Sequence, residues 1–78
     1  MYRRLRDLRE DHDKTQKEIG DLLHMSQTGY SQYEIGKNDI PTHVLKKLAT
    51  FYNTSVDYIL ELTDEAKPYP RTINRLKK

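Results

Sequence analysis

Apolar residues recur along this chain at the three- and four-residue spacings of amphipathic helices. No segment alternates apolar and polar residues as a half-buried β-strand does, and no Asn-Gly or Asp-Gly pair marks a hairpin turn. The pattern predicts five short helices, over residues 2–11, 15–23, 27–35, 41–52 and 55–62. The expected fold class is therefore all-α.

Capping signals set the ends of these helices. The segment Thr15-Gln16-Lys17-Glu18 matches a capping box, in which the hydroxyl and the carboxylate satisfy backbone N–H groups at the helix start. Ser26 is expected to cap the third helix and Gly36 to end it. A short turn, His24-Met25-Ser26, then separates the second helix from the third, which is the layout of a helix-turn-helix.

The third predicted helix has two different faces. At about 100° per residue, Tyr30 and Tyr33 lie together and can pack on a core. The opposite face carries hydrogen-bonding side chains without formal charge: Gln27, Thr28, Ser31 and Gln32. A merely solvated face usually carries Lys and Glu, whereas amides and hydroxyls suit the base edges in the major groove of DNA. An uninvolved polar surface is the alternative interpretation of this face.

Basic residues are distributed unevenly. The formal net charge is +2, but residues 66–78 carry five cations and no acid, which leaves −3 for the rest. A nucleic-acid surface on the folded part must therefore be local, and the N-termini of the second and third helices would attract phosphates without lysine. We place a domain at residues 1–64 and a basic tail at 65–78. This tail is expected to be disordered until bound, since Pro68 and Pro70 prevent the fifth helix from continuing.

Length and composition exclude several classes of protein. With 78 residues and an apolar fraction of 35%, the chain can form only one small core, without a cofactor or small-molecule pocket. The absence of cysteine excludes disulfides and thiolate zinc sites. No metal site is expected from His12, His24 and His43, which lie on different predicted elements. Ser, His and Asp occur without a nucleophile elbow, so no enzymatic activity is expected.

No segment of the sequence indicates a membrane protein. The longest apolar run is Tyr58-Ile59-Leu60, which is far too short to cross a bilayer. Residues 1–4 are not followed by the apolar stretch of a signal peptide. We expect a cytoplasmic protein without a membrane partner.

Five segments resemble the lambda-repressor-like (Cro type, xenobiotic-response-element) helix-turn-helix family in both order and spacing. They are residues 15–20 (TQKEIG), 25–28 (MSQT), 30–34 (YSQYE), 36–37 (GK) and 40–41 (IP), followed by a leucine-rich helix. The resemblance covers about residues 3–62. It implies a compact five-helix DNA-binding domain of a transcriptional regulator of bacterial or phage type. Such a domain binds double-stranded DNA in a sequence-specific manner, here with the helix at 27–35 in the major groove.

The resemblance also implies roles for individual positions. It assigns base readout to Gln27, Thr28, Ser31 and Gln32. Phosphate contacts fall to Gln16, Ser26, Lys37 and Asn38, and Gln16 also braces the first side chain of the recognition helix. An internal ion pair between the first and third helices falls to Arg9 and Glu34. His24 departs from the family pattern, because the turn usually has glycine or asparagine there; if the turn needs φ > 0, histidine tolerates it at some cost.

Two questions stay open in the sequence. The main alternative to a DNA-binding regulator is an antitoxin-like or adaptor module that binds another protein, with DNA binding secondary. A surface for such a partner, or for a weak or DNA-induced homodimer, would come from Tyr58, Leu62, Tyr69, Ile73 and Leu76. The second question concerns Arg3 and Arg4, which either contact phosphates or pair with acidic residues of their own helix, Asp7, Glu10 and Asp11.

Overall fold

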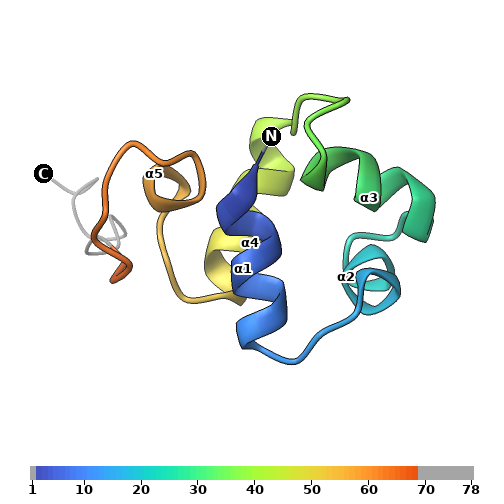
Figure 1. Ribbon diagram of the computed structural model, residues 1–78, viewed down its shortest axis with the longest axis horizontal. Helices are drawn as coiled ribbons and strands as arrows, with labels where there is room; N and C mark the ends of the chain where they lie inside the picture. The colour runs from blue at the N-terminus through green and yellow to red at the C-terminus, as the bar shows by residue number, and fades with distance from the viewer. Residues whose placement is uncertain (1, 69–78) are drawn as a thin grey trace, which may run out of the picture.

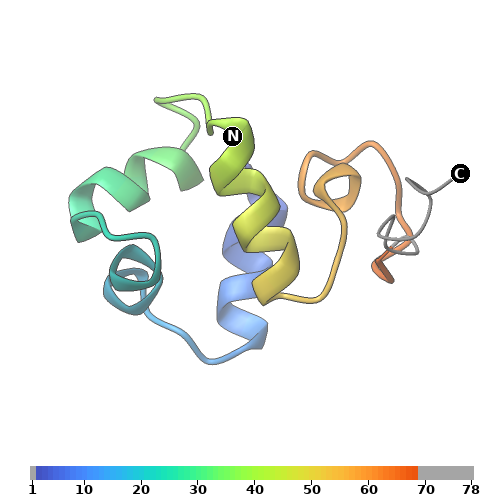
Figure 2. The same cartoon turned by 180° about the vertical axis from the view of Figure 1, so that it is seen from behind.

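The computed structural model describes residues 2–68 and contains five helices and no strand within them. The helices are α1 (Arg3–Asp11), α2 (Gln16–Leu22), α3 (Gln27–Glu34), α4 (Thr42–Phe51) and α5 (Val56–Ile59). Helices α1 and α4 occupy the middle of the molecule, with the α2–α3 pair on one side and α5 on the other (Figures 1 and 2). The predicted all-α fold with five helices is confirmed.

A single core holds the five helices together. Five large side chains are essentially inaccessible to solvent, and each comes from a different helix: Leu5, Ile19, Tyr30, Leu48 and Ile59. The remaining buried apolar residues come from α1, α4 and the segments that flank α4. Because burying one such side chain contributes about 1.5–3 kcal/mol, every helix is held by its own share of this core.

Side-chain caps are present at three helix starts, and those at Thr15 and Ser26 were predicted. At α2, both halves of the capping box form: the Glu18 N–H donates to Thr15 Oγ1 (3.1 Å) and the Thr15 N–H to Glu18 Oε1 (2.8 Å). Ser26 accepts a hydrogen bond from the Gly29 N–H at the start of α3. Ser55 caps α5 in the same way, accepting from the Tyr58 N–H. These local signals therefore place the beginnings of α2, α3 and α5 correctly.

The end of the fifth helix was predicted wrongly. It stops at Ile59 instead of continuing to Leu62, because Glu61 adopts a left-handed backbone conformation (φ 64°). The Leu62 N–H then donates to the Asp57 carbonyl (2.8 Å), which closes the helix in the manner of a Schellman motif. As a consequence, the Leu62 side chain is 72% exposed.

The turn between α2 and α3 holds His24 in the left-handed backbone region, where histidine is unusual. His24 has φ 59°, and the Met25 N–H donates to the Gly20 carbonyl at 2.9 Å, which reverses the chain. An L-residue in this region costs about 1–2 kcal/mol, and glycine avoids that cost. The turn thus contains a position where the sequence is not optimal for stability.

Replacing His24 by glycine is expected to stabilise the protein by about 0.5–1 kcal/mol, since part of the gain is lost to the freedom of glycine in the unfolded chain. The corresponding rise in Tm, about 2–8 °C for a domain of this size, is measured by thermal unfolding. The control is Lys46→Gly, at an exposed position inside α4, which is expected to lower the Tm. An unchanged or lower Tm for His24→Gly would contradict the assignment of strain to this turn.

Candidate nucleic-acid interface

Helices α2 and α3 approach each other closely at Gly20. A Cβ atom at this position would lie 3.0 Å from the Met25 carbonyl oxygen and 3.2 Å from that of Ser26. Backbone atoms cannot move aside as a flexible side chain does, so the missing side chain is what lets the two helices meet. Gly20 therefore permits the close contact between α2 and α3, which lie side by side in Figures 1 and 2.

The two faces of α3 are arranged as its periodicity predicts. Tyr30 is fully buried, and Tyr33 lies partly buried against it, with ring centroids 6.4 Å apart in a T-shaped contact. On the opposite face, Gln27 and Thr28 are exposed, while Ser31 and Gln32 are half-buried. The Ser31 hydroxyl donates to the Thr28 carbonyl (2.9 Å). No other described part of the chain covers Gln27, so this face is open to a ligand.

The other predicted contact residues lie around the two ends of α3. Ser26 is exposed at its start, and its Oγ accepts from the Gly29 N–H (3.0 Å), which leaves the hydroxyl proton free to donate. Lys37 is exposed in the loop that follows α3. Asn38 is exposed in the same loop and donates from Nδ2 to Gln32 Oε1 (2.9 Å). This last pairing joins two predicted site residues, and no local sequence signal indicated it.

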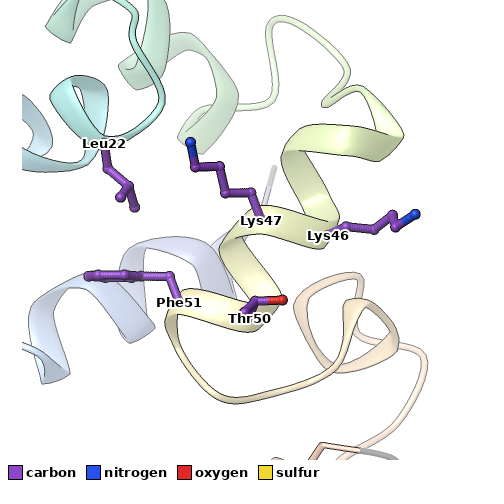
Figure 3. A pocket seen from close by; sticks show the side chains of 5 residues that line it. All are labelled: Leu22, Lys46, Lys47, Thr50 and Phe51. Carbon is purple, nitrogen blue, oxygen red and sulfur yellow. The ribbon is translucent and has the colours of Figure 1, made fainter. Parts of the chain in front are cut away.

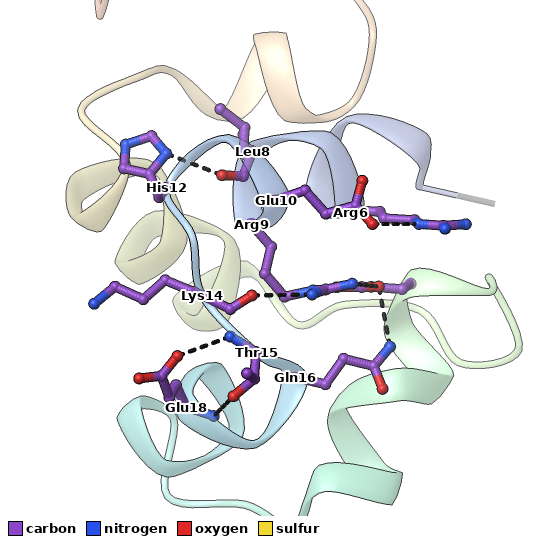
Figure 4. A network of polar contacts seen from close by, with 10 residues as sticks. Arg6, Leu8, Arg9, Glu10, His12, Lys14, Thr15, Gln16 and Glu18 are labelled. Atoms are coloured by element: carbon purple, nitrogen blue, oxygen red, sulfur yellow. Dashed lines mark hydrogen bonds and ion pairs between the residues drawn. The ribbon is translucent and has the colours of Figure 1, made fainter.

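Arg9 of α1 and Glu34 of α3 form a bidentate ion pair. Arg9 Nε lies 2.7 Å from Glu34 Oε2 and Nη2 lies 3.2 Å from Oε1, with side chains 12% and 4% exposed. Arg9 Nη1 also donates to the Lys14 carbonyl (3.0 Å), which ties the end of α1 to the start of α2. Figure 4 shows the Arg9 guanidinium between Lys14 and Gln16. The ion pair therefore joins three helices at one point.

Gln16 takes part in this network. Its Nε2 donates to Glu34 Oε1 at 3.1 Å, so it braces the carboxylate of the ion pair (Figure 4). The resemblance had implied a brace on the first side chain of the recognition helix, Gln27; the hydrogen bond shown here is made to Glu34 instead. One N–H of the amide remains available to a phosphate.

Charge and burial act in opposite directions on the Glu34 carboxyl. Burial disfavours the ionised form and would raise its pKa, but the hydrogen bonds from Arg9 and Gln16 outweigh this effect and hold the pKa below its ordinary value. The hydrogen bond to Glu34 correspondingly raises the pKa of Arg9. The pair is therefore ionised at neutral pH, and α3 carries no exposed negative side chain on the face formed by Gln27, Thr28, Ser31 and Gln32.

The arginines near the start of α1 have partners that differ from those predicted. Arg4 donates to the carbonyl oxygens of Tyr58 and Thr63 and to Asp64 Oδ1 (2.7 Å), and its guanidinium lies 4.2 Å from the centroid of the Tyr58 ring. Arg3 pairs with Glu61 (3.0 Å). Both were expected to contact phosphates or acids of their own helix. They attach α1 to the chain that follows α5 and do not pair with acids of α1, and phosphate contact by either arginine stays a prediction.

A further contact continues this attachment toward the C-terminal side. Thr54 Oγ1 donates to the carbonyl oxygen of Ala66 at 2.6 Å, and Thr54 itself is buried. The domain boundary at residue 64 stays a prediction. The predicted tail at 65–78 lies mostly outside the described residues, as do Tyr69, Ile73 and Leu76, whose proposed part in a partner surface is not addressed by the structure.

A shallow groove lies between the end of α2 and the second half of α4. Leu22, Lys46, Lys47, Thr50 and Phe51 line it, and Figure 3 shows Leu22 and Phe51 facing one another across it. The groove is open to solvent, whereas ligand pockets bury most of a small molecule's surface. Among residues 2–68, no three His, Asp or Glu side chains gather in a way that would hold a metal ion. No helix in that range has the length and apolar character needed to span a bilayer.

Comparisons with known proteins agree with this architecture. The family model described as "Helix-turn-helix" matches residues 5–59. Three proteins of Bacillus subtilis (strain 168) are similar to the chain. The uncharacterized HTH-type transcriptional regulator YobD is 39% identical over 69 residues, which cover 87% of this chain and 62% of that protein.

The HTH-type transcriptional regulator ImmR is 35% identical over 67 residues (86% of this chain, 53% of ImmR). The SPbeta prophage-derived uncharacterized HTH-type transcriptional regulator YonR is 33% identical over 60 residues (77% and 56%). The chain thus spans between about half and three-fifths of the length of these relatives, and no solved structure gives a significant match. Because the family model covers most of the chain, and the caps, turn and buried tyrosine face agree with it, this protein belongs to the lambda-repressor-like helix-turn-helix family.

Proposed function

We propose that this chain binds double-stranded DNA in a sequence-specific manner as the DNA-binding domain of a transcriptional regulator, with α3 in the major groove. The observation that carries the proposal is the exposed, uncharged amide and hydroxyl face of α3, which is anchored from behind by Tyr30. Family membership and the transcriptional regulators among its relatives support it. Cofactors and catalysis have no part in this function.

Base readout is assigned to the residues that project from α3. Gln27 and Thr28 are the most exposed of them and lie in its first turn, the part of a recognition helix that reaches base edges first. A glutamine amide pairs with adenine N6 and N7, and a threonine methyl contacts the thymine methyl. Ser31 and Gln32, one turn further along, read the neighbouring base pairs.

Phosphate contacts are assigned to four groups at the rim of this face. Ser26 and the free N–H groups at the start of α3 present donors together with the positive end of the helix dipole. Gln16 has one amide N–H left after its bond to Glu34, and Asn38 has one left after its bond to Gln32. Lys37 supplies the full positive charge. A folded part without a net positive charge can thus bind DNA through this local set of donors.

We further propose a weak or DNA-induced homodimer in the cytoplasm. Two copies on half-sites about one helical turn apart would read roughly twice as many base pairs as one copy. Leu62 is 72% exposed and follows α5, which lies on the opposite side of α1 and α4 from α3 (Figure 1), so it is available for such a contact. The same residue would serve the alternative, an antitoxin-like or adaptor module that binds another protein.

Selection of bound duplexes from a random pool tests the proposed function. The wild-type chain is expected to enrich a defined sequence, and Gln27→Ala is expected to lose about tenfold of discrimination at the base pair that this side chain contacts. Its Tm should stay at the wild-type value, since the Gln27 side chain is exposed and makes no hydrogen bond within residues 2–68. Unaltered base preference in Gln27→Ala would remove the proposed readout, and no enrichment by the wild type would refute sequence-specific binding.

A further inference from the structure

The shallow groove between α2 and α4 is apolar between its walls and basic along its edge. Leu22 is half-buried and Phe51 is 39% exposed, and the two side chains face one another across the groove (Figure 3). Lys46 and Lys47 also line it, and both are exposed. Lysine lays its methylene stem on apolar surface and keeps its ammonium group in water. The groove thus combines an apolar slot with two positive charges.

Lys46 and Lys47 have no acidic partner among residues 2–68. Every arginine of this range, and Lys17, forms an ion pair with an Asp or Glu side chain. No ion pair within it reaches Lys46 or Lys47, and α4 itself contains no Asp or Glu. The positive edge is a local exception, because residues 1–65 carry a net charge of −3. These two cations, beside an exposed apolar slot, are available to carboxylates of another molecule.

Charge argues against occupants from this chain. The sequence of residues 69–78 contains arginine and lysine but no acid, so the lysines of the groove would repel it. A second copy placed groove against groove would bring the same two lysines of both copies together, which is equally unfavourable. DNA would match the lysines, but phosphates leave the apolar walls, Leu22 and Phe51, without a counterpart. The occupant that matches both features is acidic and apolar at once.

We propose that the groove binds an acidic segment of a partner protein. A large apolar side chain of that segment enters between Leu22 and Phe51, and its carboxylates lie beside the two lysines. An open groove accommodates a chain segment that continues past both of its ends, as an enclosed pocket does not. Aromatic side chains at the centre of such contacts carry much of the affinity, and complementary charge at the rim accelerates association. This surface is separate from Leu62 and from the uncharged face of α3, so it adds a protein partner to the proposed DNA-binding function.

The experiment uses a library of random peptides displayed on phage, selected against the full 78-residue chain. Enriched peptides are expected to combine Asp or Glu with Phe, Leu or Trp. An enriched peptide is then synthesised with a fluorescent label, and its affinity is measured by anisotropy at several salt concentrations. Raising the salt concentration should weaken its binding, since both lysines are exposed.

Three variants and a control locate the binding site of this peptide. Phe51→Ala removes one apolar wall and should weaken peptide binding by about tenfold or more. Lys46→Glu and Lys47→Glu each reverse a charge at the edge, so each should weaken binding by about tenfold and flatten its salt dependence. The matched control, Lys67→Glu, makes the same change of net charge at an exposed position beyond α5 and should keep the wild-type affinity. Thermal unfolding of each variant checks that the fold is intact.

Loss of peptide binding in the three groove variants, but not in Lys67→Glu, supports the inference. A library without enriched peptides overturns it, as do enriched peptides that lack acidic residues. Equal weakening in Lys67→Glu also overturns it, since net charge would then account for the binding. With a labelled duplex, a loss of DNA affinity of about tenfold in Lys47→Glu but not in Lys67→Glu would assign the edge to phosphates instead. A wild-type dimer in sedimentation that Phe51→Ala dissociates would place a second copy in the groove and overturn the inference as well.

Discussion

Arg9→Ala is expected to destabilise the fold by about 3–5 kcal/mol, a large part of the stability of a domain this small. The substitution removes one partner of a buried ion pair and leaves the Glu34 carboxylate, which is 4% exposed, without its opposite charge. It also removes the bond to the Lys14 carbonyl that joins α1 to α2. Chemical denaturation with urea, followed by circular dichroism, measures the loss.

Two variants show whether the loss of stability in Arg9→Ala arises because the ion pair is buried. Arg6→Ala, on the same helix, removes an exposed pair with Glu10 and is expected to cost at most about 0.5 kcal/mol. The double variant Arg9→Met with Glu34→Leu leaves no buried charge, so it should recover most of the stability lost in Arg9→Ala. A loss below about 1 kcal/mol for Arg9→Ala would show that the pair is not structural.

The destabilisation caused by Arg9→Ala should depend on pH, because the pKa of Glu34 is lowered in the folded wild type. Since Arg9 and Gln16 hold the pKa of Glu34 below its unfolded value, the carboxylate contributes stability above the unfolded pKa, and this contribution is lost as the pH falls through the folded pKa. In Arg9→Ala, Glu34 can escape the cost of an unpaired charge by taking up a proton. The difference in stability between the wild type and Arg9→Ala should therefore narrow in acid.

Thr28→Glu is expected to weaken DNA binding by about 100-fold or more while the Tm stays close to that of the wild type. Thr28 is exposed in the first turn of α3, where a carboxylate would face the phosphates of the duplex, and juxtaposed like charges cost several kcal/mol. The fold should tolerate the change, because an acidic residue near a helix start interacts favourably with the dipole. Fluorescence anisotropy with a labelled duplex measures the affinity.

The matched control is Thr50→Glu, which makes the same chemical change at an exposed position near the end of α4. Thr50 lines the shallow groove of Figure 3 and lies outside the proposed DNA interface. The Thr50→Glu variant should therefore bind DNA with nearly the affinity of the wild type. Equal losses in both variants would indicate a general effect of net charge. Wild-type affinity in Thr28→Glu would mean that this face of α3 does not enter DNA.

Local features of the fold were predictable from sequence because their signals lie within a few residues. The capping box at Thr15, the cap at Ser26 and the tyrosine face of α3 all depend on neighbours three or four positions apart. The Arg9–Glu34 pair spans 25 positions and came from the family resemblance, not from periodicity. The readout residues came from the uncharged face of the third helix as well as from the resemblance, the phosphate contacts of named side chains came from the resemblance, and both await the experiments above.

Contacts across the fold had no such signal. Arg4 meets Thr63 and Asp64 about sixty positions away, and nothing in the spacing of α1 distinguishes it from an arginine exposed to solvent. The bond between Asn38 and Gln32 depends on the path of a loop after a left-handed glycine. The early end of α5 depends on the conformation of Glu61, a residue type that is usual in helices. Each of these follows from tertiary packing.

The distribution of fully buried side chains, one in each helix, has a consequence for how the proposed readout face is lost on heating. Detaching any helix would remove one of these side chains from the common core and leave a void there. Melting should therefore be all-or-none, without a partially folded form that keeps α3 in place. The proposed DNA recognition can therefore be no more heat-resistant than the attachment of the shortest helix, the four-residue α5.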